Sequence, residues 1–119
     1  MASSQKRKGS RAELDVARWL QRMGHIKAAR IQAGTHDDIG DISGISGVVV
    51  EVKDRMQHNW KEYFGQLATQ IVNKDGYTGV IIVKRPGITD PGKWLAVMPA
   101  YEWINLINIL EEARPDLQS

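Results

Sequence analysis

The sequence predicts one α/β domain in which a central mixed β-sheet is flanked by helices. Segments with helical periodicity stand near both ends and in the middle of the chain, and short runs rich in β-branched residues separate them. A length of 119 residues suits one compact domain, and a composition of 42% hydrophobic and 25% charged residues argues against disorder. We expect the order α-β-β-β-α-β-β-α, with residues 1–9 as a basic flexible arm and residues 10–114 as the domain.

The first predicted helix covers residues 10–23, because apolar residues recur there at spacings of three and four. Ser10 is expected to be its N-cap, and Gly24 is expected to end it. Ser10 and Glu13 also have the spacing of a capping box, in which the glutamate binds the backbone at the helix start. Glu13 lies on the apolar stripe of this helix, which favours a role in a site instead.

Three strands and a second helix are predicted next. Residues 25–33 alternate loosely, and residues 41–44 and 48–53 flank a three-residue loop that is typical of a hairpin. Asn59 is expected to cap the second helix, which residues 73–76 end. The apolar face of this helix contains Trp60, Phe64, Leu67 and Ile71.

The remaining elements are two strands and a final helix. Residues 79–83 form an apolar run that is typical of a strand buried on both faces. A turn-rich loop over residues 86–93 leads to a strand over residues 94–98. Pro99 is expected to begin a last helix that extends to about Ala113.

Basic residues concentrate near the N-terminus. Residues 6–30 contain eight lysines and arginines against two acidic residues, and the sequence pI is about 9.0. Such a segment favours a polyanionic partner, because each phosphate contact releases counterions. A solvated terminus is the alternative interpretation.

Several functional classes are excluded by what the sequence lacks. With no cysteine, it offers no disulfide scaffold, no thiolate zinc site and no thiol nucleophile. No apolar run reaches the ~18–20 residues that span a bilayer, and the first residues lack the apolar stretch of a signal peptide. We therefore expect a cytoplasmic protein without a membrane partner.

The predicted hairpin places three charged side chains on one face. If residues 44 and 48 close its loop, Asp41 lies directly across from Glu51, and directly opposed residues point to the same face. Lys53 joins them because it is two residues further along the strand. The other face receives Ile42, Val48, Val50 and Val52.

This arrangement suggests phosphodiester chemistry. Two facing carboxylates repel each other unless a cation lies between them or one of them stays protonated. An all-oxygen pair suits Mg²⁺, which can act as a Lewis acid on a phosphodiester, while Lys53 could orient a water or offset developing charge. The alternative is a solvated pair of Glu51 and Lys53 with Asp41 as a turn residue, and a register slip of one residue would remove the argument.

At these positions the sequence resembles the PD-(D/E)XK nuclease signature. The match consists of Gly40-Asp41-Ile42, a step of ten residues from Asp41 to Glu51, and Glu51-Val52-Lys53, with Gly40 where the motif often has proline. The similarity covers most of the chain, and it is greatest to the small Holliday junction resolvase-like endonucleases of archaea and bacteriophages. Those enzymes are dimeric and cut branched DNA with Mg²⁺.

The resemblance implies a restriction-endonuclease-like core and assigns roles to single residues. It implies Asp41 and Glu51 as metal ligands, the carbonyl of Val52 as a third ligand, and Lys53 as the catalytic lysine. Glu13 matches the glutamate of the family's first helix and completes an acidic catalytic cluster. The implied cofactor is Mg²⁺, for which Mn²⁺ is an expected substitute.

Basic and amide side chains are the expected DNA contacts. Lys84 and Arg85 follow a buried strand and should emerge near the end of the sheet, and Gln66 matches a family position that supports substrate or water near the metal. Solubility and simple exposure are the alternative interpretations for the N-terminal basic residues and for Gln66. The expected DNA-binding residues are Lys6, Arg7, Lys8, Arg11, Arg30, Gln66, Lys84 and Arg85.

Other polar residues are weaker candidates for metal ligands. Asp37 and Asp38 are alternatives to Asp41, although their spacing to Glu51 suits a loop better. The three histidines lack the spacing of metal ligands and are expected on the surface or in loops. They are His25, His36 and His58.

The functional prediction is a Mg²⁺-dependent deoxyribonuclease that cuts branched DNA, as in Holliday junction resolution during recombination or phage DNA processing. The expected setting is the cytoplasm of a prokaryotic or phage-infected cell. The helices that carry Trp60 and Trp103 offer more apolar surface than one copy can bury, which favours a homodimer. The alternatives are a flap, end-processing or restriction-type nuclease, and a non-catalytic nucleic-acid-binding module.

Overall fold

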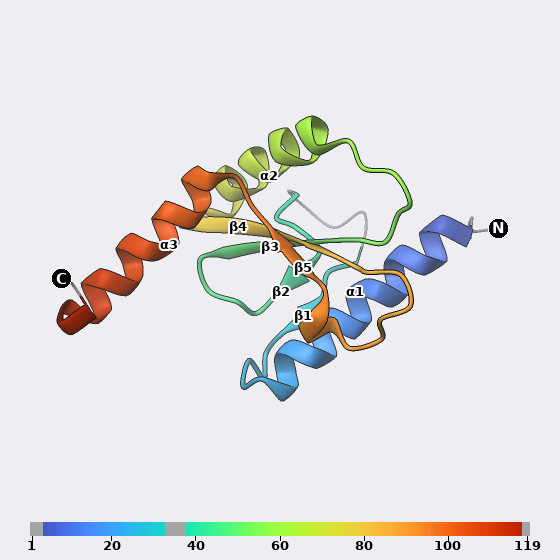
Figure 1. Cartoon of the computed structure of the whole chain (residues 1–119), viewed down its shortest axis with the longest axis horizontal. Coiled ribbons are helices and arrows are strands. Elements are labelled where there is room, and N and C mark those ends of the chain that lie inside the picture. The colour runs from blue at the N-terminus through green and yellow to red at the C-terminus, as the bar shows by residue number, and fades with distance from the viewer. Residues whose placement is uncertain (1–3, 33–37, 118–119) are drawn as a thin grey trace.

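The computed structural model describes the backbone of residues 4–32 and 38–117 and the side chains from residue 8 onward (Figure 1). Its fold is α/β, and the predicted order of helices and strands is confirmed. Two short 3-10 helices, Pro91–Lys93 and Pro115–Leu117, were not predicted. The elements are α1 (Ser4–Arg22), β1 (Ala29–Arg30), β2 (Ile42–Ser43), β3 (Val48–Lys53), α2 (Trp60–Lys74), β4 (Thr78–Val83), β5 (Leu95–Val97) and α3 (Ala100–Ala113).

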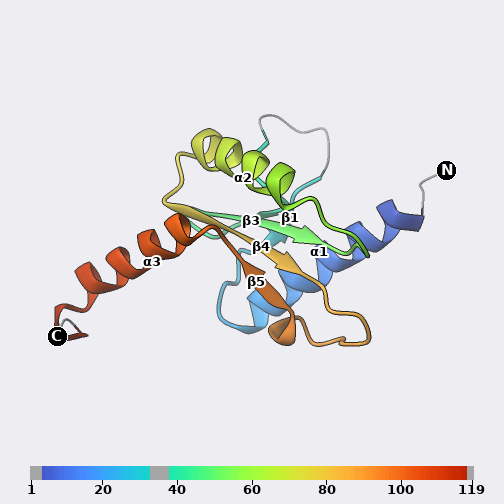
Figure 2. The ribbon, with the colours of Figure 1, turned by 45° about the horizontal axis from the view of Figure 1, so that its top comes forward.

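The five strands form one mixed sheet in the order β1-β2-β3-β4-β5. β3 and β4 are parallel and α2 connects them, whereas the other three strand pairs are antiparallel. Helices α1 and α2 cover opposite faces of this sheet (Figure 2). The mixed sheet flanked by helices is therefore confirmed.

Helix α1 begins earlier than predicted. It starts at Ser4, so Ser10 lies inside the helix, and the predictions of an N-cap at Ser10 and of a capping box with Glu13 are wrong. The cause is the segment before Ser10, where glutamine, lysine and arginine are good helix formers and continue the helix backward. Residues 4–9, expected in a flexible arm, are helical instead.

The strands differ from their predictions mainly in length. β3 has the predicted bounds, whereas β1 and β2 have two residues each. β1 lies at the edge of the sheet, where its register with β2 pairs Ala29 with Ser43 and Arg30 with Ile42. Its partner β2 also has only two residues, and the ladder between the two strands ends there.

Two apolar layers fill the space on either side of the sheet. On the α1 side, Ile42, Val50 and Val52 pack with residues of α1, and the half-buried Val48 packs against them. This confirms that these four residues share one face. The layer on the α2 side consists of Val49, Tyr63, Leu67, Ile81 and Val83.

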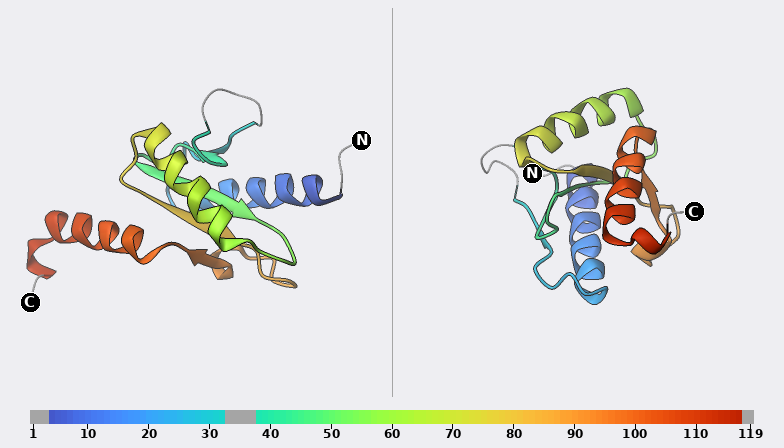
Figure 3. Two further views of the ribbon diagram at one scale, coloured as in Figure 1. Left: turned by 90° about the horizontal axis from the view of Figure 1, so that it is seen from above. Right: turned by 90° about the vertical axis from the view of Figure 1, so that its left-hand side faces the viewer.

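Helix α3 extends away from the sheet, on the opposite side of the molecule from the start of α1 (Figures 1 and 3). All fourteen of its residues are described, and none of them is fully buried. Its contact with the sheet is at its first turns, where Thr78 Oγ1 donates a hydrogen bond to the carbonyl of Glu102 at 3.0 Å. Within the described part of the chain, no helix is long and apolar enough to cross a membrane.

Candidate active site

The start of β2 is shaped by Gly40. This residue has a φ of +105°, and a Cβ built on it would lie 2.9 Å from Val49 Cγ1 and 3.0 Å from the carbonyl oxygen of Val50. Only glycine adopts this conformation without strain, and a proline, whose φ is fixed near −65°, cannot adopt it. The departure from the motif's usual proline therefore has a conformational reason.

Asp41 follows this turn and is held against β3 from both its backbone and its side chain. Its N–H donates to the carbonyl of Val50 at 2.8 Å, and its Oδ2 accepts a hydrogen bond from the N–H of Val52 at 2.8 Å. The pairing of Ile42 with Val50 confirms the predicted hairpin register, in which Asp41 is next to Glu51. Val52 reaches the site through its N–H, and its predicted carbonyl ligation stays a prediction.

Glu51 and Lys53 lie on the α2 side of β3. Glu51 is only 5% exposed, and its Oε2 is 3.4 Å from Lys53 Nζ. The ammonium of Lys53 also lies 4.7 Å from the centre of the Tyr63 ring. Lys53 is thus held between a buried carboxylate and an aromatic face.

The carboxylates of Glu13, Asp41 and Glu51 affect one another electrostatically. Burial raises the pKa of Asp41 to about 7, and the negative charge of Glu51 adds to this effect. Burial likewise raises the pKa of Glu51, against the opposing effect of Lys53, and raises the pKa of Glu13, against that of Arg30. The structure therefore brings together the three predicted acidic residues and Lys53.

Glu13 is positioned by Arg30. Arg30 Nε donates to Glu13 Oε2 at 2.7 Å, and Arg30 Nη2 donates to Ser10 Oγ at 3.0 Å. The guanidinium of Arg30 is thus engaged inside the protein, and its predicted DNA contact stays a prediction.

Two further residues belong to the cluster: Gln70, which was not predicted, and Asp38, which was predicted only as an alternative to Asp41. Gln70 is fully buried, and its Nε2 donates to Glu51 Oε1 at 2.6 Å and to the two carboxylate oxygens of Asp38 at 2.9 and 3.0 Å. Gln66, one helical turn earlier, donates to Asp38 Oδ2 at 3.1 Å. Gln66 and Gln70 stand four residues apart on α2, and this spacing was the available signal.

The remaining predicted DNA-binding residues lie on two surfaces. Lys84 and Arg85 follow β4 at the end of the sheet, where Lys84 Nζ lies 3.8 Å from Asp54 Oδ2 and Arg85 Nη1 donates to the carbonyl of Lys93 at 3.1 Å. Their contact with DNA stays a prediction. Lys8 and Arg11 are exposed on α1. The side chains of Lys6 and Arg7 lie outside the described part, as do all atoms of His36 and Asp37.

The other two histidines have separate surroundings. His25 is exposed in the loop after α1, in agreement with its prediction. His58 is half-buried in the loop before α2, and its Nδ1 is 3.1 Å from the hydroxyl of Tyr63.

The donor set of the cluster fits a hard divalent cation. Within residues 4–32 and 38–117, no three acidic or histidine side chains already stand in the geometry of a metal centre. The donors are nevertheless all carboxylate oxygens, which Mg²⁺ prefers, and the repulsion between Glu51 and Asp41 adds to the rise in the pKa of Asp41. A cation bound here would offset that repulsion.

Comparisons of the chain with protein-family models, with curated proteins and with solved structures found no match.

Proposed function

We propose that this protein is a Mg²⁺-dependent endonuclease that hydrolyses phosphodiester bonds in branched DNA on a restriction-endonuclease-like core. The observation that carries the proposal is the convergence of Asp41, Glu51 and Lys53, with Glu13 beside Asp41, on a hairpin whose register matches the PD-(D/E)XK signature. Buried acidic residues of raised pKa next to a lysine are typical of catalytic sites. The setting we propose is DNA recombination or phage DNA processing in the cytoplasm.

We assign a separate role to each residue of the proposed site. Asp41 and Glu51 would hold the metal ion, together with the Val52 carbonyl, and Glu13 would complete the acidic cluster. When bound, Mg²⁺ or Mn²⁺ would supply Lewis-acid chemistry for the phosphodiester and for a water. Lys53 carries the positive charge that can offset the charge developing on the phosphate.

Neighbouring side chains orient these groups. Gln70 fixes one oxygen of Glu51, and Arg30 fixes one oxygen of Glu13. Both contacts leave the second oxygen of each carboxylate to other partners. Such positioning reduces the reorganisation that catalysis requires.

We also propose that the protein acts as a homodimer through α3. Trp103, Leu106 and Leu110 recur at spacings of three and four and are 53%, 37% and 48% exposed. An amphipathic helix that extends from its own domain leaves an apolar stripe uncovered, and the same stripe on a second copy is its self-complementary partner. Two copies would present two active sites to the two strands of a junction.

The dimer is tested by light scattering of the purified protein. Leu106→Glu should convert a dimer to a monomer, whereas Glu112→Gln on the same helix should not. A wild-type protein that is monomeric at all concentrations would contradict the dimer, and the nuclease proposal would stand apart from it.

The activity is tested with end-labelled four-way junction, flap and linear duplex DNA, each with Mg²⁺, Mn²⁺ or EDTA. We expect paired symmetric cuts in the junction, lost with EDTA and lost in Glu51→Gln. Cutting of flaps or linear duplex in preference to junctions would replace the proposed substrate by that of a flap, end-processing or restriction-type nuclease. Binding without cleavage under all conditions would contradict the enzyme and favour a nucleic-acid-binding module.

A further inference from the structure

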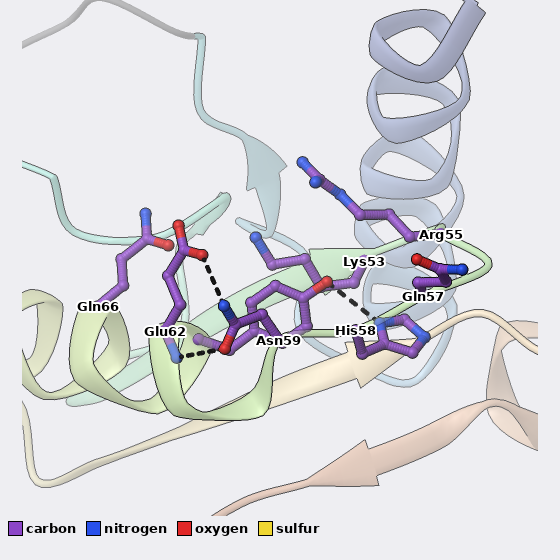
Figure 4. Close-up of a pocket in the computed structure, with 8 residues that line it drawn as sticks. Lys53, Arg55, Gln57, His58, Asn59, Glu62 and Gln66 are labelled. Carbon is purple, nitrogen blue, oxygen red and sulfur yellow. Dashed lines mark hydrogen bonds between the residues drawn. The ribbon is translucent and has the colours of Figure 1, made fainter.

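A polar hollow of about 490 Å³ opens beside Lys53, between the end of β3 and the first turns of α2 (Figure 4). Lys53 and Arg55 line it from β3 and the following loop, and Glu62 and Gln66 line it from α2. Gln57, His58, Asn59 and Tyr63 complete its walls. The volume lies within the range of about 300–1,000 Å³ that is usual for small-ligand sites.

The hollow adjoins the candidate active site at Lys53. This lysine lines the hollow and is also 3.4 Å from the carboxylate of Glu51. A DNA strand with a phosphate at the acidic cluster must therefore place a neighbouring nucleotide over the hollow, since successive phosphates are one nucleotide apart.

The charges of the hollow suit a phosphate on one side. Lys53 and Arg55 supply two cations, and Arg55 is exposed, with no hydrogen bond or ion pair among the described residues. Glu62 is the acidic lining residue, and its carboxylate accepts a hydrogen bond from Asn59 Nδ2 at 3.3 Å. A phosphate would therefore contact the side of Lys53 and Arg55, away from Glu62.

The other walls suit a base. The ring of His58 packs 5.0 Å from that of Trp60 and 5.7 Å from that of Tyr63, and its Nδ1 is 3.1 Å from the Tyr63 hydroxyl. A ring held in this way can stack on a base without losing conformational freedom. The amides of Gln57 and Gln66 carry both donors and acceptors, so they can meet the edge of any base.

Resting on the proposed function, we propose that this hollow binds one nucleotide of the DNA strand next to the cleaved phosphate. Arg55 contacts the phosphate of that nucleotide, and His58 stacks on its base. Because amides line the hollow, the nucleotide is recognised with little preference among the four bases.

The test uses four-way junctions that carry the fluorescent base 2-aminopurine at successive positions of one strand around the branch point, in EDTA. Stacking quenches this base, so the wild-type protein should quench it at one position more than at its neighbours. His58→Ala should abolish the extra quenching, and His58→Phe should restore it. Arg55→Ala should weaken junction binding roughly tenfold.

Arg22→Ala is the matched control, because Arg22 is an exposed arginine at the end of α1, outside the hollow. It should change neither the quenching nor the affinity by a comparable factor. Melting curves of each variant show whether a loss reflects unfolding. Quenching that is the same in wild type and His58→Ala would overturn the inference.

The same junctions with Mg²⁺ separate this inference from the proposed function. Position-specific quenching that depends on His58, in a protein that cuts no DNA, would support the hollow as a nucleotide site and overturn the nuclease. If the wild-type protein cleaves DNA but the quenching is the same in His58→Ala, the result would support the nuclease and overturn the hollow as a nucleotide site.

Discussion

The two faces of β3 are equally buried but chemically different. Val50 and Val52, on the α1 side, are 5% and 4% exposed, and Glu51, on the α2 side, is 5% exposed. The valines pack in an apolar layer, whereas Glu51 meets a lysine and a glutamine. Since a buried carboxylate costs stability unless it is paired, the α1 side of β3 supplies packing energy alone, whereas its α2 side adds Glu51 and Lys53 to an apolar layer that includes Val49.

The largest effect should come from the α2 side, through Lys53. Lys53→Met should reduce cleavage of a four-way junction at least about a hundredfold, because it removes the charge that offsets the transition state, while junction binding stays near that of wild type. Single-turnover cleavage and binding assays measure the two quantities. Lys27→Met, at an exposed lysine in the loop after α1, is the control, and equal activity of both variants would contradict the role of Lys53.

The α1 side should respond in the opposite way. Ile42 is 0% exposed, and Ile42→Ala should lower the free energy of unfolding by about 2–5 kcal/mol through lost packing and a cavity. Chemical denaturation measures this loss. Below its melting temperature the Ile42→Ala variant should cleave DNA at the rate of wild type. A cleavage rate as low as that of Lys53→Met would contradict the separate roles of the two faces.

On the α2 side, Gln70 should affect both the stability of the fold and the rate of cleavage. Gln70→Met keeps the size of the side chain but removes the amide that Glu51 and Asp38 share, so the buried Oε1 of Glu51 loses this donor. We expect a loss of about 1–3 kcal/mol in the free energy of unfolding, together with slower cleavage. Gln66→Met, which removes a more exposed donor to Asp38, should have a smaller effect on both.

The smallest effect should be the pH dependence of stability without metal. The pKa of Asp41 is raised from its ordinary 3.8 to about 7, so the folded protein holds a proton that the unfolded chain releases in this interval. Stability should therefore fall as the pH rises through this window, in the direction also given by the raised pKa values of Glu13 and Glu51. Melting in EDTA should occur lower at about pH 8 than at about pH 5, by roughly 4 °C or more.

Asp41→Asn is the control for this pH effect, since an amide does not titrate. Its melting temperature should change less between the two pH values than that of wild type. A wild-type protein that is more stable at about pH 8 would contradict the assigned electrostatics.

The central hairpin could be predicted because local rules determine it. The glycine-containing loop fixes the register of residues 41–44 and 48–53, and strand alternation then separates Glu51 from Val50 and Val52. Asn59 was predicted as the cap of α2 on equally local grounds, and its side chain accepts the N–H of Glu62 at 3.2 Å.

The contacts of Gln70 could not be predicted because they join distant segments. Glu51 is 19 residues away and Asp38 is 32, and the crossover through α2 brings them together. Hydrophobic periodicity located the buried face of α2 in part. Leu67 is buried as predicted, and Phe64 and Ile71 pack against the same layer. The buried Tyr63 and Gln70 were not predicted, and a glutamine is stable there because carboxylates accept its hydrogen bonds.

The start of α1 was misjudged for a different reason. Ser10 and Glu13 have the spacing of a capping box, but the side chains of both contact Arg30, from β1. Two residues with the spacing of a local capping box therefore make a tertiary contact with Arg30 instead. The same contact places Glu13 at the acidic cluster, where the resemblance to the nuclease family had assigned it.

The central claim, that the α2 side of β3 and its neighbours form a metal site, is tested most directly by calorimetric titration of Mn²⁺ into metal-free protein at about pH 8. We predict saturable binding by wild type and by Asp15→Asn, a control on α1 outside the site, and its loss in Asp41→Asn. Equal binding by wild type and Asp41→Asn, or no binding by wild type, would contradict the account.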